Sequence, residues 1–258
     1  MKELSKRLMT GLIGIILLFL VIKQGGIYLS LSLLLLSLVG INEFYSVLEK
    51  LHLNPIRSIG YLGTLGLFLI NMVESISIEL FIVLVTISLF IILMRDSKLT
   101  ISDISVTALG LLYIPFLLGH IFYLDGTKYI WLIFIIAFGT DTFAYMFGNI
   151  FGKTKLSPNI SPNKTIEGSL GGIFGSLVCS IIYASIIGIG PKWKIVILSI
   201  FISIIAQLGD LVASRIKRMA NIKDYGFIFP GHGGVLDRFD SIIFSAPLIY
   251  YYVQYFLI

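Results

Sequence analysis

The sequence predicts an all-α integral membrane protein that crosses the bilayer about nine times. Of its 258 residues, 57% are hydrophobic and only 13% are charged, and the mean hydropathy is +0.98. Soluble domains carry about 25% charged residues, and disordered chains combine high charge with low hydrophobicity. Both classes are therefore excluded. The apolar segments leave no room for a soluble domain, so we expect a single membrane domain over residues 1–258.

Nine apolar segments approach the length of about 20 residues that a helix needs to cross a bilayer core. The first follows a basic stretch, like a signal peptide, but no small-residue cleavage site follows it, so we expect it to be retained. Pro115 is expected to kink the fifth. The segments are 8–23, 27–47, 59–74, 78–94, 104–123, 128–150, 168–190, 193–213 and 241–257.

Lysine and arginine are distributed unevenly between the two sets of connections. Fifteen of the 19 lie at the N-terminus or in the even-numbered connections, and four lie on the other side. The positive-inside rule then places the N-terminus and the loops 151–167 and 214–240 in the cytoplasm. Cations such as Lys50 and Arg57 are expected to serve topology alone, and no nucleic-acid partner is expected. The one cysteine, Cys179, allows no intrachain disulfide.

Two carboxylates interrupt apolar runs in the second half of the chain. Residues 1–137 read mostly as scaffold helices, whereas residues 138–258 carry the polar chemistry. Asp141 and Asp210 lie within predicted spans, where a charge costs a few kcal/mol and marks a functional site by default. The alternative is a structural role for each, as a buried ion pair or a helix-end charge.

Asp210 belongs to a polar face that continues toward the following loop. Helical spacing of three and four places Gln207, Asp210, Ser214, Lys217 and Arg218 on one side. The loop that follows contains three glycines, at positions 231, 233 and 234, which permit positive φ and close approach to a ligand. Asp237 and Asp240 then start the last span.

Carboxylates mixed with many cations at a membrane surface indicate metal-assisted chemistry on phosphates. Mg²⁺ is typically held by one or two carboxylates together with substrate phosphates. Lysine and arginine would neutralise the remaining phosphate oxygens.

The loop after the sixth span carries a second polar cluster. Gly148 to Thr154 approaches a P-loop, but three residues separate its glycines where the motif needs four, and a membrane helix precedes it, so this reading is rejected. Lys153 and Lys164 are either phosphate contacts or ordinary positive-inside lysines.

Residues 214–240 resemble the signature of the phosphatidate cytidylyltransferases, also called CDP-diacylglycerol synthases. Residues 141–153 and 161–168 are also similar to that family, so the resemblance is specific in the second half of the chain. The matching signature positions are Ser214, Ile216, Lys217, Arg218, Lys223, Asp224, Gly226, Phe229, Pro230, His232, Gly233, Gly234, Val235, Asp237, Arg238, Phe239 and Asp240.

This resemblance implies an enzyme that joins CTP to phosphatidate, giving CDP-diacylglycerol and pyrophosphate for phospholipid biosynthesis. It also implies Mg²⁺ as cofactor, with a second cation left open. The expected setting is the cell membrane, among lipid, with the active site facing the cytoplasm.

The site residues expected from the motifs fall into three groups. The metal ligands are Asp210 and Asp237, with Asp141 and Asp240 as further candidates. The catalytic group is Lys217, Arg218, Lys223, Asp224, His232 and Arg238, where His232 acts either as a base or as a hydrogen-bond donor to phosphate. The substrate-binding group is Ser214, Lys153, Lys164, Gly233 and Gly234.

Three other functions are alternatives to a cytidylyltransferase. A CTP-dependent kinase of polyprenols or phytol would use a similar site but move the γ-phosphoryl group. A CDP-alcohol phosphotransferase would need a D-G-x-x-A-R motif, which the 237–240 stretch lacks. A cation-coupled transporter would gather its polar groups near the midplane. Gly171 and Gly175 permit close helix packing, within the monomer or in a homodimer.

Overall fold

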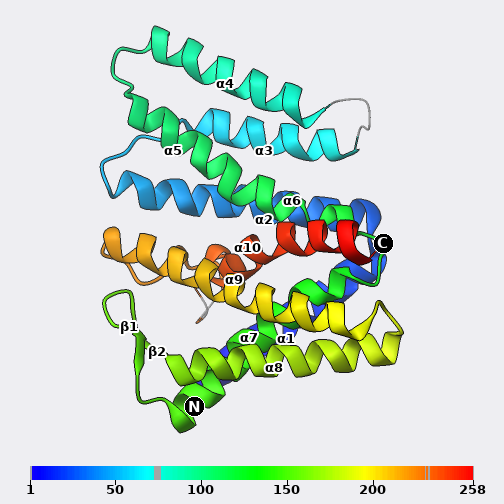
Figure 1. Cartoon of the computed structure of the whole chain (residues 1–258). Helices are drawn as coiled ribbons and strands as arrows, with labels where there is room; N and C mark the ends of the chain where they lie inside the picture. The colour runs from blue at the N-terminus through cyan, green and yellow to red at the C-terminus, as the bar shows by residue number, and fades with distance from the viewer. Residues whose placement is uncertain (1, 73–76, 230, 232, 258) are drawn as a thin grey trace. The chain divides into compact units, whose positions relative to one another are not determined.

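The computed structural model describes residues 2–72, 77–229, 231 and 233–257, and helices dominate this part of the chain (Figure 1). The described part of each of the nine predicted segments is mostly helical, with residues 73–74 of the segment 59–74 outside the described residues, so the all-α prediction is confirmed. The elements are α1 (Lys2–Gln24), α2 (Gly26–Glu49), α3 (Arg57–Met72), α4 (Ile78–Arg95), α5 (Ile101–Leu111), η1 (Leu112–Phe116), α6 (Leu117–Gly119), η2 (Phe122–Leu124), α7 (Ile130–Phe151), β1 (Lys155–Ser157), β2 (Ser161–Thr165), α8 (Ile166–Ile187), α9 (Lys192–Met219), α10 (Leu236–Tyr252) and η3 (Val253–Leu257).

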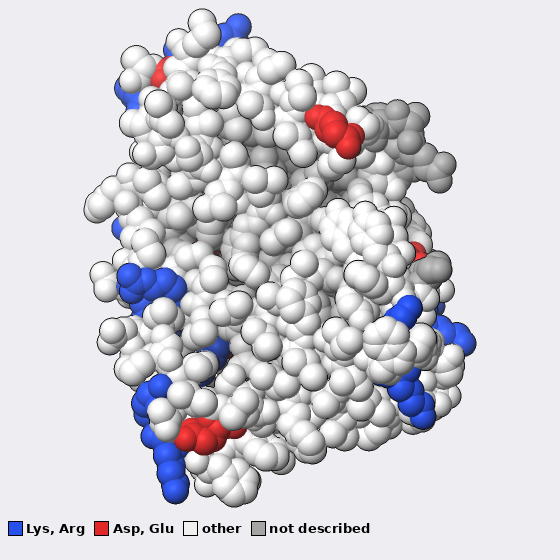
Figure 2. Space-filling model, in the orientation of Figure 1, with Lys and Arg blue, Asp and Glu red and all other residues white. Residues whose placement is uncertain are grey.

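Six helical segments of the described chain are long and apolar enough to cross a membrane. They are Gly26–Lys50, Ile78–Arg95, Ile101–Leu124, Ile130–Phe151, Ile166–Ile187 and Lys192–Met219. In Figure 2 the charged side chains lie mainly toward the left and right margins, and most of the surface between them is uncharged, as a lipid-facing surface requires. The chain is thus a multi-pass membrane protein, while the total of nine spans and the cytoplasmic N-terminus stay predictions.

Pro115 distorts its span as expected. It lies in η1, a single π-helical turn between α5 and α6. Proline has no N–H to donate, and its ring clashes with the preceding turn, so the backbone widens locally. The helix therefore continues past the proline with a local change of geometry.

The chain forms two compact units, which we describe separately. Unit 1 comprises Met1–Phe122 and Met219–Arg238, and unit 2 comprises Tyr123–Arg218 and Phe239–Ile258. In unit 1, the fully buried Tyr45 of α2 fills the space left by Gly60 of α3 and Gly110 of α5. Its hydroxyl donates to the Thr107 carbonyl at 2.8 Å, which ties α2 to α5.

Arg57 corrects one expectation, because it does more than orient the chain. Its guanidinium donates to both carboxylate oxygens of Glu49, each at 2.8 Å, and also to Asn42 and Ser46. The hydrogen bond to Glu49 raises the pKa of Arg57 above its usual value. Arg57 therefore fastens the start of α3 to the end of α2, which a point charge such as lysine would do poorly.

In unit 2, α7 and α8 pack backbone against backbone. A Cβ at Gly171 or Gly175 of α8 would overlap the rings of Phe147 and Phe143 of α7. A Cβ at Gly172 would lie 2.8 Å from the Thr140 carbonyl oxygen. The expected close packing at these glycines thus occurs within the chain.

A short antiparallel hairpin, which the sequence reading did not predict, links α7 to α8. Strands β1 and β2 pair with Lys155 opposite Thr165. Thr165 also caps α8 by accepting the Gly168 N–H at 3.1 Å, so β2 leads into α8 without a linker. The Glu167 carboxylate accepts the N–H groups of Lys153 and Thr154, both at 3.1 Å, and fixes the base of the hairpin.

Candidate active site

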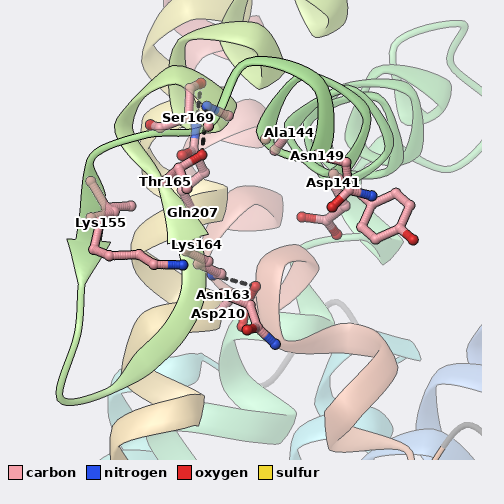
Figure 3. A pocket seen from close by; sticks show the side chains of 15 residues that line it. Asp141, Ala144, Asn149, Lys155, Asn163, Lys164, Thr165, Ser169, Gln207 and Asp210 are labelled. Atoms are coloured by element: carbon pink, nitrogen blue, oxygen red, sulfur yellow. Dashed lines mark hydrogen bonds and ion pairs between the residues drawn. The ribbon is translucent and has the colours of Figure 1, made fainter.

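Unit 2 contains a pocket of about 620 Å³ where the hairpin meets the second halves of α7 and α9 and the start of α8 (Figure 3). Both acids singled out within apolar runs, Asp141 of α7 and Asp210 of α9, line it. Two lysines from the hairpin, Lys155 and Lys164, line it as well. The pocket thus combines opposite charges from segments far apart in the sequence.

Asp210 contacts a lysine and a serine side chain. Its Oδ2 lies 2.5 Å from Lys164 Nζ, and its Oδ1 accepts a hydrogen bond from Ser214 Oγ at 3.2 Å. One turn before it, Gln207 donates to the Ser169 carbonyl at 3.3 Å and so anchors α9 against α8. Gln207 and Asp210, which belong to the predicted polar face of α9, thus line the pocket.

Two further acids lie near Asp210 in the same unit. Asp240, at the start of α10, is buried and lies close enough to Asp141 and Asp210 for their charges to act on it. Ser241 links the acids, since its N–H donates to Asp240 Oδ1 at 2.8 Å and its Oγ to Asp141 Oδ2 at 3.4 Å. The buried Lys217 also acts on Asp240 and offsets part of this negative charge.

Within the described residues, no three His, Cys, Asp or Glu side chains come close enough to hold one metal ion. Mg²⁺ does not require such a cluster, because substrate phosphates and water complete its shell around one or two carboxylates. Asp141, Asp210 and Asp240 supply the hard oxygen donors that this ion prefers. The donor set of unit 2 therefore fits Mg²⁺.

The hairpin changes which lysine reaches the pocket. Lys155, which sequence reasoning missed, lines the pocket and extends into it in Figure 3, whereas Lys153 is absent from the lining. Only the backbone N–H of Lys153 has a described role, at Glu167. No sequence signal identifies Lys155, because its place follows from the strand register, which sets it opposite Thr165. Arg218 lies beside the same hairpin and donates to the Ile160 carbonyl at 3.4 Å.

The remaining signature residues form a loop in unit 1. Asp237 Oδ2 accepts the N–H groups of Tyr225 at 2.7 Å and Gly234 at 2.9 Å, so this predicted metal ligand also closes the loop. Gly231 and Gly233 have positive φ, 77° and 82°, as their type allows. His232 lies outside the described residues.

Gly234 has another reason to be glycine. It is not among the residues with positive φ, and a Cβ there would overlap Oε1 of Glu43 in α2. Glu43 is buried and accepts the N–H groups of Val235 and Leu236, each at 2.9 Å. Sequence reasoning missed Glu43, although an acid inside the apolar run 27–47 is the same signal that identified Asp141.

These features define a multi-pass membrane protein with a pocket of carboxylates and lysines suited to phosphate groups and a divalent cation. The chain belongs to the cytidylyltransferase family, whose sequence pattern it matches over residues 5–256. It is 35% identical to the phosphatidate cytidylyltransferase of Staphylococcus haemolyticus, covering 94% of this chain and 96% of that protein. The proteins of the same name from Staphylococcus saprophyticus and Staphylococcus aureus are 33% identical over the same shares.

Proposed function

We propose that this protein transfers the cytidylyl group of CTP to phosphatidate, forming CDP-diacylglycerol and releasing pyrophosphate. The observation that carries the proposal is the pocket of unit 2, which is lined by Asp141 and Asp210 of two apolar helices and by Lys155 and Lys164 of the hairpin. A reaction between a lipid phosphate and a nucleotide needs such a place, since one substrate is held in the membrane and the other is soluble.

The chemistry asks for positioning more than for a protein nucleophile. A phosphatidate oxygen attacks the α-phosphorus of CTP in line, a new P–O bond forms, and the bond to the β-phosphate oxygen breaks. Phosphatidate is already anionic near neutral pH, so no general base is required. Lys155 and Lys164 neutralise phosphate oxygens as charge accumulates, which is the largest contribution side chains usually make to such steps.

Mg²⁺ is the proposed cofactor. Asp210 and Asp237 would hold it, with Asp141 and Asp240 as further carboxylates. When bound, the ion would neutralise phosphate charge and orient the triphosphate. Lys217 and Ser241 keep Asp240 and Asp141 in place in the absence of other cations.

The proposed location is the cell membrane, with the pocket facing the cytoplasm. Fifteen of the 19 lysines and arginines fall on the side of the loops 151–167 and 214–240, and CTP is a cytoplasmic metabolite. Lys217, Arg218, Lys223 and Arg238 would then serve the phosphates in addition to topology.

A radiolabel experiment tests the proposal directly. Purified protein is incubated with phosphatidate, Mg²⁺ and CTP carrying ³²P in either the α or the γ position, and the lipid is extracted. We expect label in the lipid from the α position only. Label from the γ position would indicate a kinase, and unlabelled lipid in both arms would contradict the proposal. Asp210→Asn prepared in parallel excludes a contaminating host enzyme.

A further inference from the structure

A buried acid in α2 contacts the signature loop of unit 1, although the two are almost 200 residues apart. Glu43 is 5% exposed and lies within the apolar segment Gly26–Lys50. Its two carboxylate oxygens each accept one backbone N–H, Val235 to Oε1 and Leu236 to Oε2, at 2.9 Å. Val235 directly precedes α10 and Leu236 is its first residue, so no earlier residue of the helix can accept these N–H groups.

The loop is shaped around this carboxylate. A Cβ at Gly226 or at Gly234 would overlap Glu43 Oε1, and neither glycine has a positive φ that would explain it otherwise. One turn before Glu43, a Cβ at Gly40 would lie 3.2 Å from the Leu236 side chain. Three glycines therefore leave the room that Glu43 and Leu236 occupy.

The same turn contains residues with proposed roles in the reaction. Asp237 follows Leu236 directly and closes the loop through the N–H groups of Tyr225 and Gly234. The N–H of Arg238 donates to the Val235 carbonyl at 3.0 Å. Any shift of Val235 or Leu236 thus moves Asp237 and Arg238 with them.

We infer that Glu43 is a positioning residue, which sets the orientation of Asp237 and Arg238 by holding the backbone of Val235 and Leu236. This inference rests on the proposed function for what the loop does in the reaction. A carboxylate is required, because it offers an acceptor to each of the two N–H groups. Glutamine of the same shape would turn an NH₂ donor toward one of them.

The test compares Glu43→Gln with Glu49→Gln in the full-length protein reconstituted in phosphatidate-containing vesicles. Glu49 lies on the same helix, but its carboxylate contacts the Arg57 side chain and no backbone N–H of the loop. We expect Glu43→Gln to lower kcat about ten- to a hundredfold, since a lost hydrogen bond in a buried charged contact has effects of that order. The KM for CTP should change little, because the loss falls on the transition state. Glu49→Gln weakens the contact with Arg57 but not the loop, so its kcat should fall less than that of Glu43→Gln, and exchange in 225–237 should stay at the wild-type rate.

Amide hydrogen exchange supplies a readout that a general loss of stability would not produce. In Glu43→Gln, exchange should accelerate in peptides covering 225–237 and stay at the wild-type rate elsewhere. Unchanged kcat and exchange would overturn the inference. Acceleration throughout the chain would overturn it as well, since Glu43 would then stabilise the fold as a whole.

A second variant decides the matter where Glu43→Gln does not accumulate. Gly234→Ala keeps the carboxylate and adds one methyl group in the space of Oε1, so it should reproduce the local exchange and the loss of kcat. A silent Gly234→Ala would contradict the inference. Wild-type protein that makes no CDP-diacylglycerol would refute the proposed function alone, because the exchange experiment tests the loop contact without it.

Discussion

Lys164 and Asp210 form an ion pair, with 2.5 Å between Nζ and Oδ2, so a predicted phosphate contact and a predicted metal ligand neutralise each other. Both side chains remain about a quarter exposed, at 28% and 26%, which leaves them accessible from the pocket. A divalent cation bound at Asp210 would compete with the ammonium group for the same oxygen. Binding of a substrate phosphate to Lys164, or of a metal ion to Asp210, would therefore weaken this ion pair.

Replacing Lys164 by glutamine should therefore change the metal requirement. Without the competing ammonium, the Mg²⁺ concentration that gives half-maximal activity should fall by up to about fivefold, as an exposed ion pair is worth roughly 1 kcal/mol or less. The kcat should fall too, since a phosphate contact is lost. Initial rates measured over a Mg²⁺ series check both effects. Lys155→Gln is the matched control, with lower kcat and no tightening of Mg²⁺, and a weaker Mg²⁺ response in Lys164→Gln would contradict this account.

The hairpin gives Lys155 and Lys153 different surroundings, because Lys155 lines the pocket and Lys153 does not. Lys155→Gln should lower kcat, but by less than the 10²- to 10³-fold seen when a charge-stabilising group is removed from a water-excluded site, because the Lys155 side chain is exposed. Lys153→Gln should be nearly silent, because the Lys153 contact at Glu167 uses its backbone N–H. Steady-state kinetics on both variants decide the point, and equal losses would show that the hairpin does not select between them.

Asp210→Asn should nearly abolish turnover while the protein still inserts and folds. Asparagine keeps the shape and can accept from Ser214, but it loses the charge that attracts Lys164 and a metal ion. Asp96→Asn, at an exposed position just after α4, is the control for a lost carboxylate. Full activity of Asp210→Asn at ordinary Mg²⁺ concentrations would refute the metal assignment.

Exchanging the type of cation separates phosphate contacts from topological charges. Arg238→Lys and Lys223→Arg should each lose most activity, because arginine forks onto two oxygens and lysine is a point charge. Expression and orientation should stay unchanged. Lys50→Arg is the appropriate silent control. Arg57→Lys is unsuitable, since it breaks the paired contact with Glu49. If Arg238→Lys and Lys223→Arg are as silent as Lys50→Arg, those two cations serve only to orient the chain in the membrane.

Cysteine labelling tests the orientation of the pocket. Asn159 is exposed at the turn of the hairpin, and Cys179→Ala provides a cysteine-free background. In intact cells, an impermeant thiol reagent should not reach Asn159→Cys. Lys128→Cys, in a connection on the opposite side by the charge count, should react readily. Labelling of Asn159→Cys but not of Lys128→Cys would show that the chain has the opposite orientation.

Much of the fold follows from local sequence features. Runs of apolar residues long enough to span a bilayer locate all nine helical segments, and Asp141 and Asp210 stand out because charge is rare within them. The hairpin was missed for a physical reason. Its strands lack an apolar alternation, and they are held by Glu167 and by the packed ends of α7 and α8, which no local pattern reveals.

Glu43 illustrates the same limit at longer range. Its partners Val235 and Leu236 contribute only backbone N–H groups, which every residue but proline possesses. The identity of these two residues therefore does not indicate that an acid 192 residues earlier in the chain contacts them. The glycines at 226 and 234 stand out in the sequence, but only the structure shows that they make room for the carboxylate of Glu43 in α2.

The direct passage from β2 into α8 has a consequence for how the two substrates meet. Thr165 alone separates Lys164 from the first residue of α8, a helix long and apolar enough to cross a membrane, which would place Lys164 near the boundary between headgroups and acyl chains. Lifting a lipid out of the bilayer costs about 0.8 kcal/mol for each methylene exposed to water. A pocket at this depth avoids that cost, since phosphatidate can arrive by lateral diffusion with its chains still immersed. The soluble nucleotide is then the substrate that must descend.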